Sequence, residues 1–299
     1  MNLSPTIAAV VATKGRAEDL RRLLHSLRDQ TRPVTSILIV DQNADDRLAG
    51  ILADFTDLPV VHHRTPDLVG LCRNRNFGWQ AAQADIVIFP DDDCWYPVDF
   101  MAKAVALFEA TGADLVCGRP TDTTGRTING KFGTTACWVD RRSVWFSQIE
   151  WAFLARRDVM AATGGFDESL GVGSGTDFGA CEMQDVSLKA LALGYREYYD
   201  PALVAHHPEI VMQHGEGDWY RRVPSYARGM GYVLAKHGYP FRTACVWAAR
   251  PVVGALLHAL RLRFWHAGLG LQSAFGRLQG YLMMRRIMAS GDRGTRRTP

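Results

Sequence analysis

Five short apolar runs without polar alternation mark the first 120 residues. They span residues 6–12, 36–40, 58–61, 85–89 and 114–117. Runs of this length, some of them rich in β-branched residues, are typical of strands that are buried on both faces. The pattern predicts the parallel strands of one sheet.

Helical periodicity fills most of the gaps between these runs. Segment 17–30 places four leucines on one stripe, and segments 71–84 and 97–111 look similar, with Pro97 suited to a first helical turn. Strands that alternate with helices predict an α/β fold with a mostly parallel sheet. In such sheets ligands bind beyond the carboxyl ends of the strands.

The pattern changes in the second half of the chain. Residues 119–150 are polar and loop-rich, and a glycine-rich stretch precedes a predicted helix over 182–193 that ends at Gly194. From about residue 218 the chain is helical and basic. We therefore expect a catalytic domain over 1–217 and a helical region over 218–299, with 291–299 as a disordered tail.

Composition and charge narrow the class of protein. The 299 residues are 47% hydrophobic and 22% charged, which excludes a disordered or fibrous chain. Residues 1–220 carry a net charge of −10, whereas residues 221–299 carry +13 with a single acid. This asymmetry indicates an anionic partner for the C-terminal part.

The cysteines, the N-terminal segment and the most apolar late segment argue against a zinc or disulfide framework, a signal peptide and a spanning helix. The six scattered cysteines have neither zinc-type nor disulfide-framework spacing and favour a reducing compartment. The N-terminal segment lacks the basic region of a signal peptide. Segment 243–260 contains Arg250, Pro251 and His258, so it does not offer 18 uncharged residues for a spanning helix.

Three adjacent acids, Asp91, Asp92 and Asp93, follow the run 85–89 directly. Adjacent carboxylates repel one another unless a cation neutralises them. A small set of oxygen ligands suits Mg²⁺ or Mn²⁺ that bridges a diphosphate. The alternative is an acidic turn that caps the next helix.

Polar residues at the other predicted strand ends suit a nucleotide. Asp41 can accept a hydrogen bond from a base or a ribose, or form an Asx-turn. Thr13 and Arg16 follow the first run, and Arg73 opens a helix where a guanidinium can hold phosphate. Ordinary surface capping explains each of these residues singly.

Two acids and two histidines complete the candidate chemistry. Glu182 and Asp185 are three residues apart on one predicted helix, so they share a face, and either can serve as a general base. Acids that favour the helix N-terminus are the alternative. His206 and His207 follow a strand-like segment as metal ligands or as packed side chains.

The ordered motifs VVATKGR, IVDQN, FPDDDCWYP, TGGFDESLGVGSG, CEMQDVSLKALALGY and YYDPALVAHH resemble family 2 glycosyltransferases of the GT-A fold. The resemblance covers roughly residues 5–210. It implies a GT-A-type, Rossmann-like sheet and a metal-dependent transfer of a sugar from a nucleotide-diphosphate donor to an acceptor hydroxyl, with inversion.

Carried onto this chain, the resemblance assigns roles to the candidate residues. The acid triplet becomes the D-x-D element, and the segment GGFDE lines the sugar and acceptor pocket. The predicted donor contacts are Thr13, Arg16, Asp41, Arg73, Asp91 and Asp92. The predicted metal ligands are Asp93, Asp91 and His207, and the predicted pocket residues are Gly165, Phe166, Asp167 and Trp151.

One departure affects the catalytic helix. The family usually has an adjacent Glu-Asp pair there, whereas this chain reads Glu182-Met183-Gln184-Asp185. Asp185 is the preferred base, with Glu182 next. The family's Q-x-x-R-W motif of processive members is not found, which favours transfer of a single hexosyl or deoxyhexosyl unit. The resemblance favours UDP or dTDP over GDP in the donor.

Arginines, aromatic residues and aliphatic residues mix in the predicted amphipathic helices 246–264 and 269–288. This composition suits an anionic membrane surface; packing on the sheet and dimerisation are the alternatives. With a lipid-linked or cell-envelope glycan as acceptor, the expected location is the cytoplasmic face of the membrane. No nucleic-acid motif is present.

A second function fits parts of the sequence, and a third fits it less well. A non-catalytic nucleotide-sugar-binding or scaffolding protein of polysaccharide assembly is suggested by Met183 in a normally acidic position. A nucleotidyltransferase needs a basic glycine-rich loop after the first strand, and ATKGR is too short and too poor in glycine.

Overall fold

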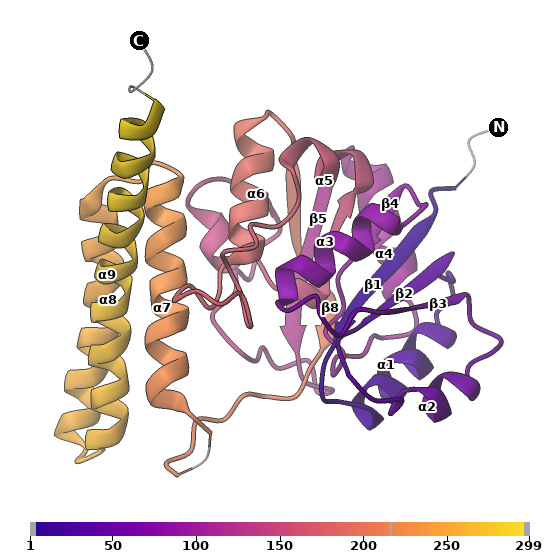
Figure 1. Ribbon diagram of the computed structural model, residues 1–299, viewed down its shortest axis with the longest axis horizontal. Helices are drawn as coiled ribbons and strands as arrows, with labels where there is room; N and C mark the ends of the chain where they lie inside the picture. The colour runs from indigo at the N-terminus through magenta and orange to yellow at the C-terminus, as the bar shows by residue number, and fades with distance from the viewer. Residues whose placement is uncertain (1–3, 216, 296–299) are drawn as a thin grey trace. The chain divides into compact units, whose positions relative to one another are not determined.

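The computed structural model describes residues 4–215 and 217–295 of the chain (Figure 1). The chain divides into two compact units. The first unit is Met1–Phe166 with Val186–Ile210, and the second is Asp167–Asp185 with Val211–Pro299. The sequence-based boundary at residue 217 does not anticipate that residues 167–185 group with the C-terminal helices. The division of labour between a catalytic and a membrane-associating part stays a prediction.

An eight-stranded sheet with the order β3-β2-β1-β4-β7-β5-β8-β6 forms the first unit. Neighbouring strands from β3 to β4 are parallel, as are β5 and β8, whereas β7 is antiparallel to β4 and β5, and β6 is antiparallel to β8. The α/β fold with a mostly parallel sheet is therefore confirmed, and the five apolar runs correspond to β1–β5. The strands are β1 (Ile7–Thr13), β2 (Ser36–Asp41), β3 (Val60–Arg64), β4 (Ile86–Ile88), β5 (Leu115–Thr121), β6 (Cys137–Trp138), β7 (Phe153–Arg156) and β8 (Glu197–His206).

The helices follow the predicted periodicity with small shifts at their ends. Helix α4 begins at Phe100, because Pro97 belongs to a turn in which its carbonyl accepts the Phe100 N–H at 3.1 Å. Gly194 follows α6 with a φ of 88°, as its C-terminal position predicts. The helices that involve this unit are α1 (Glu18–Arg28), α2 (Ala49–Ala53), α3 (Leu71–Ala81), α4 (Phe100–Thr111), α5 (Arg157–Thr163) and α6 (Glu182–Ala192), with short 3₁₀ turns at Ser143–Phe146 and Glu150–Ala152.

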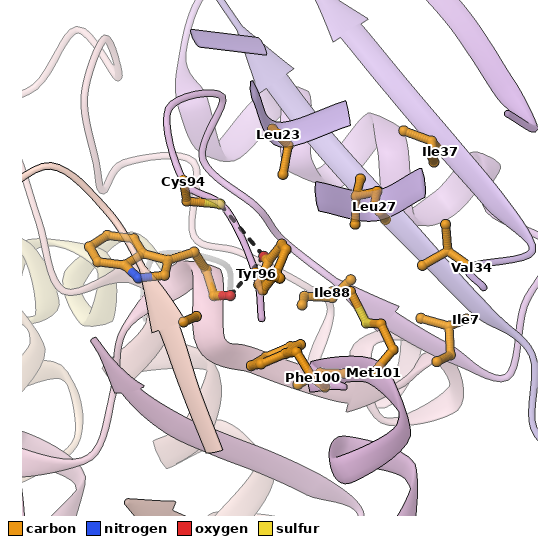
Figure 2. Packing of buried hydrophobic residues seen from close by; sticks show 14 of the residues in the cluster. Ile7, Leu23, Leu27, Val34, Ile37, Ile88, Cys94, Tyr96, Phe100 and Met101 are labelled. Atoms are coloured by element: carbon orange, nitrogen blue, oxygen red, sulfur yellow. Dashed lines mark hydrogen bonds between the residues drawn. The ribbon is translucent and has the colours of Figure 1, made fainter. Parts of the chain in front are cut away.

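Helix α1 closes one side of the core with its leucine stripe. Leu23 and Leu27 are fully buried and belong to the same cluster as Ile37 and Ile88 (Figure 2). Close to this cluster, the Tyr96 hydroxyl donates a 2.8 Å hydrogen bond to the Trp151 carbonyl. The bond ties the loop after β4 to a segment 55 residues further along the chain.

Three long helices make up most of the second unit: α7 (Trp219–Lys236), α8 (Phe241–Leu260) and α9 (Phe264–Thr295). They run side by side in Figure 1. A Cβ added at Gly231 of α7 would lie 2.0 Å from the carbonyl oxygen of Arg277 on α9. Only glycine permits this approach of two helix backbones.

One expectation for the C-terminal part is corrected, and one bears on membrane association. Residues 291–295 of the expected disordered tail continue helix α9, while residues 296–299 lie outside the described part of the chain. By length and composition alone, α8 is able to cross a membrane, since its best window has a mean hydropathy of 1.3. The helix nevertheless carries Arg250 near its middle, so it does not offer 18 uncharged residues, as the sequence indicates.

Gly78 sets the distance between α3 and the sheet. A Cβ at Gly78 would lie 2.2 Å from Val10 Cγ1 on β1 and 3.2 Å from Val40 Cγ2 on β2. Interiors packed this densely have no space for another methyl group. The start of α3 carries residues of the candidate site, so this contact also positions the site.

We expect Gly78→Ala to lower the free energy of unfolding by about 1–3 kcal/mol, because overpacking outweighs the better helix propensity of alanine. Gly50→Ala in α2 is the matched control, since a Cβ there meets no atom within 4 Å. Chemical denaturation of both variants measures the difference. Equal stabilities of the two variants would contradict the packing argument.

Candidate active site

The carboxyl ends of β1 and β4 bring Thr13 and the acid triplet together. Ala12 pairs with Asp91 in a parallel bridge that extends the β1–β4 register. The Thr13 hydroxyl donates a 2.7 Å hydrogen bond to Asp92 Oδ2. The predicted meeting of these residues at one edge of the sheet is therefore observed.

Two arginines form ion pairs with the triplet. Arg16 bonds Asp92 through Nη1, and its Nη2 lies 3.0 Å from Asp93 Oδ2. Arg75, which is almost completely buried, places Nη2 2.7 Å from Asp91 Oδ1. Burial raises the pKa of Asp92 and outweighs the opposite effect of Arg16 and Thr13.

Asp91, Asp93 and His207 form a cluster of three potential metal ligands. One ligand atom from each lies within 4.8 Å of the other two. His207 Nε2 is 2.9 Å from Asp93 Oδ1, and the imidazole stacks on Trp151 with a ring-centroid distance of 4.2 Å and an interplanar angle of 17°. The three predicted metal ligands are thus adjacent, and the predicted pocket residue Trp151 supports one of them.

The charges of this cluster are mutually dependent. Burial lowers the pKa of His207, but the carboxylate of Asp93 outweighs that effect, so the pKa of His207 is raised. Burial raises the pKa of Asp93, but His207 and Arg16 outweigh it, and the pKa of Asp93 is lowered. Two carboxylates and one imidazole are a donor set that fits a divalent cation.

The second histidine has other contacts. His206 is the last residue of β8, and its Nδ1 lies 3.1 Å from the Thr121 hydroxyl. Its ring also contacts Trp95 at a centroid distance of 5.6 Å. Successive side chains of an extended chain point in opposite directions, which explains why only His207 reaches Asp93.

The donor residues predicted from β2 and α3 have local partners. Asp41 is buried and accepts hydrogen bonds from the backbone N–H and side-chain amide of Asn43 at 2.8 and 2.7 Å, while His62 Nε2 lies 3.0 Å from its other oxygen. Arg73 is exposed in the first turn of α3. Their roles in donor binding stay predictions.

Asn76 holds the predicted pocket residues Gly165 and Phe166 against α3. Its amide oxygen accepts the Phe166 N–H at 2.9 Å, and its amide nitrogen donates to the Phe166 carbonyl at 3.0 Å. Gly165 has a φ of 69°, and a Cβ there would lie 2.6 Å from Asn76 Oδ1. Only glycine suits both constraints, because it adopts a positive φ and has no Cβ to meet the Asn76 amide.

A cavity of about 360 Å³ opens elsewhere in the first unit. None of the predicted pocket residues lines it. Its lining residues come from the loop-rich segment after β5 and from β8: Phe132, Gly133, Thr134, Cys137, Ser143, Phe146, Ser147 and Tyr199.

In the second unit, Lys236 joins two carboxylates that are far apart in the sequence. Its ammonium nitrogen lies 2.6 Å from Asp167 Oδ2 and 2.8 Å from Asp185 Oδ1. His237 Nε2 is also 2.8 Å from Asp185 Oδ1, and the Tyr232 hydroxyl donates to Asp167 at 2.9 Å. Helix α7 thus connects the predicted pocket acid with the predicted base.

The electrostatics of this group favour charged forms. Burial lowers the pKa of Lys236, but Asp185 and Asp167 outweigh it, so the pKa is raised. The pKa of Asp167 is lowered because Lys236 outweighs the effect of burial. Glu182 is also buried. Met183 is almost completely buried, so its side chain serves packing at the position where the family resemblance expects an acid.

Sequence reasoning missed the cations that hold these acids. The sequence presents Arg75 and its neighbours either as phosphate contacts or as capping residues. Its place two residues after the exposed Arg73 on α3 puts it on the opposite, buried face. Lys236 and His237 stand out in the sequence only as part of a basic region. The signal that could have found them is their adjacency at the end of a helix in a segment otherwise poor in lysine.

The profile of glycosyl transferase family 2 matches residues 8–160, which is more than half of the chain. The chain belongs to this family. The matched segment contains the acid triplet, whereas Glu182, Asp185 and His207 lie beyond it.

Two curated relatives of this family 2 member are similar over part of its length. EpsH of Bacillus subtilis, a candidate glycosyltransferase, is 25% identical over 138 residues, which are 44% of this chain and 39% of the relative. The glycosyltransferase AglE of Haloferax volcanii is 25% identical over 120 residues, which are 38% of this chain and 39% of the relative. The matched part therefore spans well under half of either relative.

Solved structures show the same fold over nearly the whole chain. One is the mannosyltransferase PcManGT from Pyrobaculum calidifontis in complex with GDP-Man and Mn²⁺, with a TM-score of 0.60 and 17% sequence identity. The superposition covers 93% of this chain and 88% of that one. TarS 1–349 of S. aureus, in complex with UDP-GlcNAc, has a TM-score of 0.56 at 16% identity, with coverage of 94% of this chain and 92% of that one. This GT-A likeness confirms the expected fold of the family 2 chain.

We expect Lys236→Met to destabilise the protein by about 3 kcal/mol at pH 7, because it removes the cation that lies between the fully buried Asp185 and the partly buried Asp167. Asp167 has a lowered pKa in the folded state, so its contribution is present above the ordinary value near 4 and is lost as the pH falls through the folded value. The difference between wild type and variant should therefore shrink below about pH 4. Urea denaturation between pH 3 and 8 measures it.

Lys103→Met is the matched control. Lys103 pairs with Asp99 at 2.8 Å, but both side chains are largely exposed, and such pairs contribute less than about 1 kcal/mol. A loss at Lys236 no larger than at Lys103, or one independent of pH, would show that the buried group contributes little.

Proposed function

We propose that this chain is an inverting, metal-dependent and non-processive glycosyltransferase. It transfers one hexosyl or deoxyhexosyl unit from a nucleotide-diphosphate donor, of the UDP or dTDP type, to a hydroxyl of a lipid-linked or cell-envelope glycan at the cytoplasmic face of the membrane. The observation that carries the proposal is the cluster of Asp91, Asp93 and His207 at the carboxyl edge of a family 2 sheet.

Asp91, Asp93 and His207 would hold the metal, which when bound supplies positive charge next to the leaving diphosphate. Their mixture of carboxylate oxygens with an imidazole nitrogen favours Mn²⁺ over Mg²⁺, because Mg²⁺ prefers oxygen ligands alone. PcManGT, whose complex contains GDP-Man and Mn²⁺, has a similar fold.

The chain's own cations would bind the donor. Arg16 is half exposed at the edge of the triplet, so its guanidinium can reach a diphosphate while it still contacts Asp92. Thr13, Asp41 and Arg73 would contact the rest of the nucleotide from β1, β2 and α3. Bound in this way, the donor presents its anomeric carbon with little freedom, which lowers the entropic part of the barrier.

Asp185 would accept the proton of the acceptor hydroxyl. As the proton moves to the carboxylate, the acceptor oxygen forms a bond to the anomeric carbon from the face opposite the diphosphate. The bond to the diphosphate breaks, and the configuration inverts. Lys236, 2.8 Å from Asp185 Oδ1, favours the ionised carboxylate that a base requires.

A second candidate is a non-catalytic nucleotide-sugar-binding or scaffolding protein. The observation that favours it is the complete burial of Asp185 between Lys236 and His237, an arrangement that also suits a purely structural role. Such a protein would bind the nucleotide and neither transfer nor hydrolyse the donor.

Calorimetry with UDP, dTDP and GDP tests the donor site, each in the presence of Mn²⁺, Mg²⁺ or a chelator. We expect one nucleotide to bind in a metal-dependent manner, and Asp93→Asn to weaken that binding at least about tenfold, since it removes a charged ligand. Asp99→Asn, which changes a more exposed acid a short distance further along the chain, is the control. Binding that ignores both metal and Asp93 would refute the metal site.

Replacement of the base separates the two candidate functions. We expect Asp185→Asn to lower the transfer rate by about 10²–10⁴-fold, the usual contribution of a general base, while nucleotide affinity stays unchanged. Glu182→Gln is the comparison and should have a smaller effect. The release of nucleoside diphosphate from the donor measures turnover in wild type and in both variants. If wild type binds nucleotide and shows no turnover with any donor, the scaffolding function replaces the enzymatic one.

A further inference from the structure

Helix α8 turns its small residues inward and its large apolar residues outward. Its buried side chains are Ala244, Ala248 and Ala255. Five of its large apolar side chains lie along one face and are between 51% and 82% exposed: Val246, Val253, Leu256, Leu257 and Leu260. A helix at the surface of a water-soluble protein has the reverse arrangement.

Helix α9 repeats the same arrangement beside it. Phe264, Leu271, Phe275 and Leu282, spaced by seven, four and seven residues, share one face and are all exposed. Between the two helices, a Cβ at Gly270 would lie 2.9 Å from the Pro251 carbonyl oxygen and 3.0 Å from Ala255 Cβ. Close contact through small residues, with large apolar side chains outside, is typical of helix pairs in lipid.

The turn between α8 and α9 continues the exposed apolar surface. Leu260, Leu262 and Phe264 are 82%, 77% and 67% exposed, and Arg261 and Arg263 alternate with them. Water makes such a tip unfavourable, because three large apolar side chains are solvated at once. In the interface of a bilayer, the apolar side chains reach the acyl region while the guanidinium groups stay with the headgroups.

The charges of this hairpin select the partner. Among its described side chains, the exposed charged residues are arginines: Arg242, Arg250, Arg261, Arg263, Arg285 and Arg286. The sequence from 221 to 299 holds a single acid, Asp292. A symmetric dimer through these faces would therefore place arginine against arginine with no carboxylate to pair. Anionic lipid headgroups provide phosphates that guanidinium groups on this surface can bind.

We propose that the α8–α9 hairpin lies in the interface of an anionic membrane, with the exposed apolar faces of both helices toward the acyl chains. Arg250 in the middle of α8 and the two arginines of the turn oppose a transmembrane position, because a span would carry them through the hydrocarbon core. This inference rests on the proposed function in one respect, since a lipid-linked acceptor gives the enzyme a reason to be at the membrane. It adds which surface of the chain binds the membrane. That surface lies within the second unit, and its binding to lipid needs no transfer activity.

Flotation of the full chain with vesicles tests the proposal without donor or acceptor. We expect binding to phosphatidylcholine vesicles that contain about 30% phosphatidylglycerol, and at least about tenfold weaker binding to phosphatidylcholine alone. The double variant Leu256→Asp/Leu260→Asp should bind the anionic vesicles at least about tenfold more weakly than wild type. Leu193→Asp, at a similarly exposed leucine in the first unit, is the matched control and should bind like wild type.

Three outcomes would overturn the proposal. The first is wild-type protein that does not float with anionic vesicles, or a double variant that floats equally well. The second is that light scattering shows wild type as a dimer and the double variant as a monomer, while neither protein binds vesicles. The third is chain that resists alkaline carbonate extraction from the membranes of expressing cells, which would indicate a span. Flotation needs neither nucleotide binding nor sugar transfer. A failure of the enzymatic function therefore leaves the flotation result unchanged and is recognised separately.

Discussion

The mutual repulsion of three adjacent carboxylates constrains the first unit more than any other interaction. Where these acids leave β4, Asp92 and Asp93 are buried and Asp91 is partly buried, so uncompensated charge at this edge is costly. Each acid is therefore met by a cation from another element: Arg75 of α3, Arg16 after β1, and His207 after β8. The packing of α3 at Gly78 and the end of β8 both serve to bring these cations into place.

In the second unit, one lysine pairs with two acids, and a histidine contacts one of them. Asp167 and Asp185 both lie next to the ammonium group of Lys236, which compensates for the desolvation of the fully buried Asp185 and the partly buried Asp167. The lysine thereby links the glycine-rich turn before α6 to the start of that helix. The two clusters differ in one respect. In the first unit, two carboxylates and a histidine place one ligand atom each within reach of a single cation. In the second unit, a lysine ammonium group lies between the two carboxylates.

The helical part follows a different principle, in which backbone proximity replaces side-chain packing. Glycines on α7 and α9 and alanines on α8 let the helices approach closely, and the large apolar side chains remain outside. Propensity and periodicity predicted helices there correctly, but they misplaced the helix ends. The spacing of apolar residues in a sequence shows that a helix has an apolar face and does not show which neighbour, if any, covers it.

The sequence by itself determined the α/β class, the five parallel strands and the acidic edge, because these depend on periodicities and neighbours within a few residues. It also indicated the candidate metal ligands Asp91 and Asp93 and the pair of adjacent histidines. Only the tertiary structure decided that His207 rather than His206 meets Asp93, that Arg75 is buried against Asp91, and that Lys236 joins Asp167 to Asp185. These pairs are between 16 and 114 residues apart in the chain, and such contacts arise from the packing of whole elements, which no local pattern encodes.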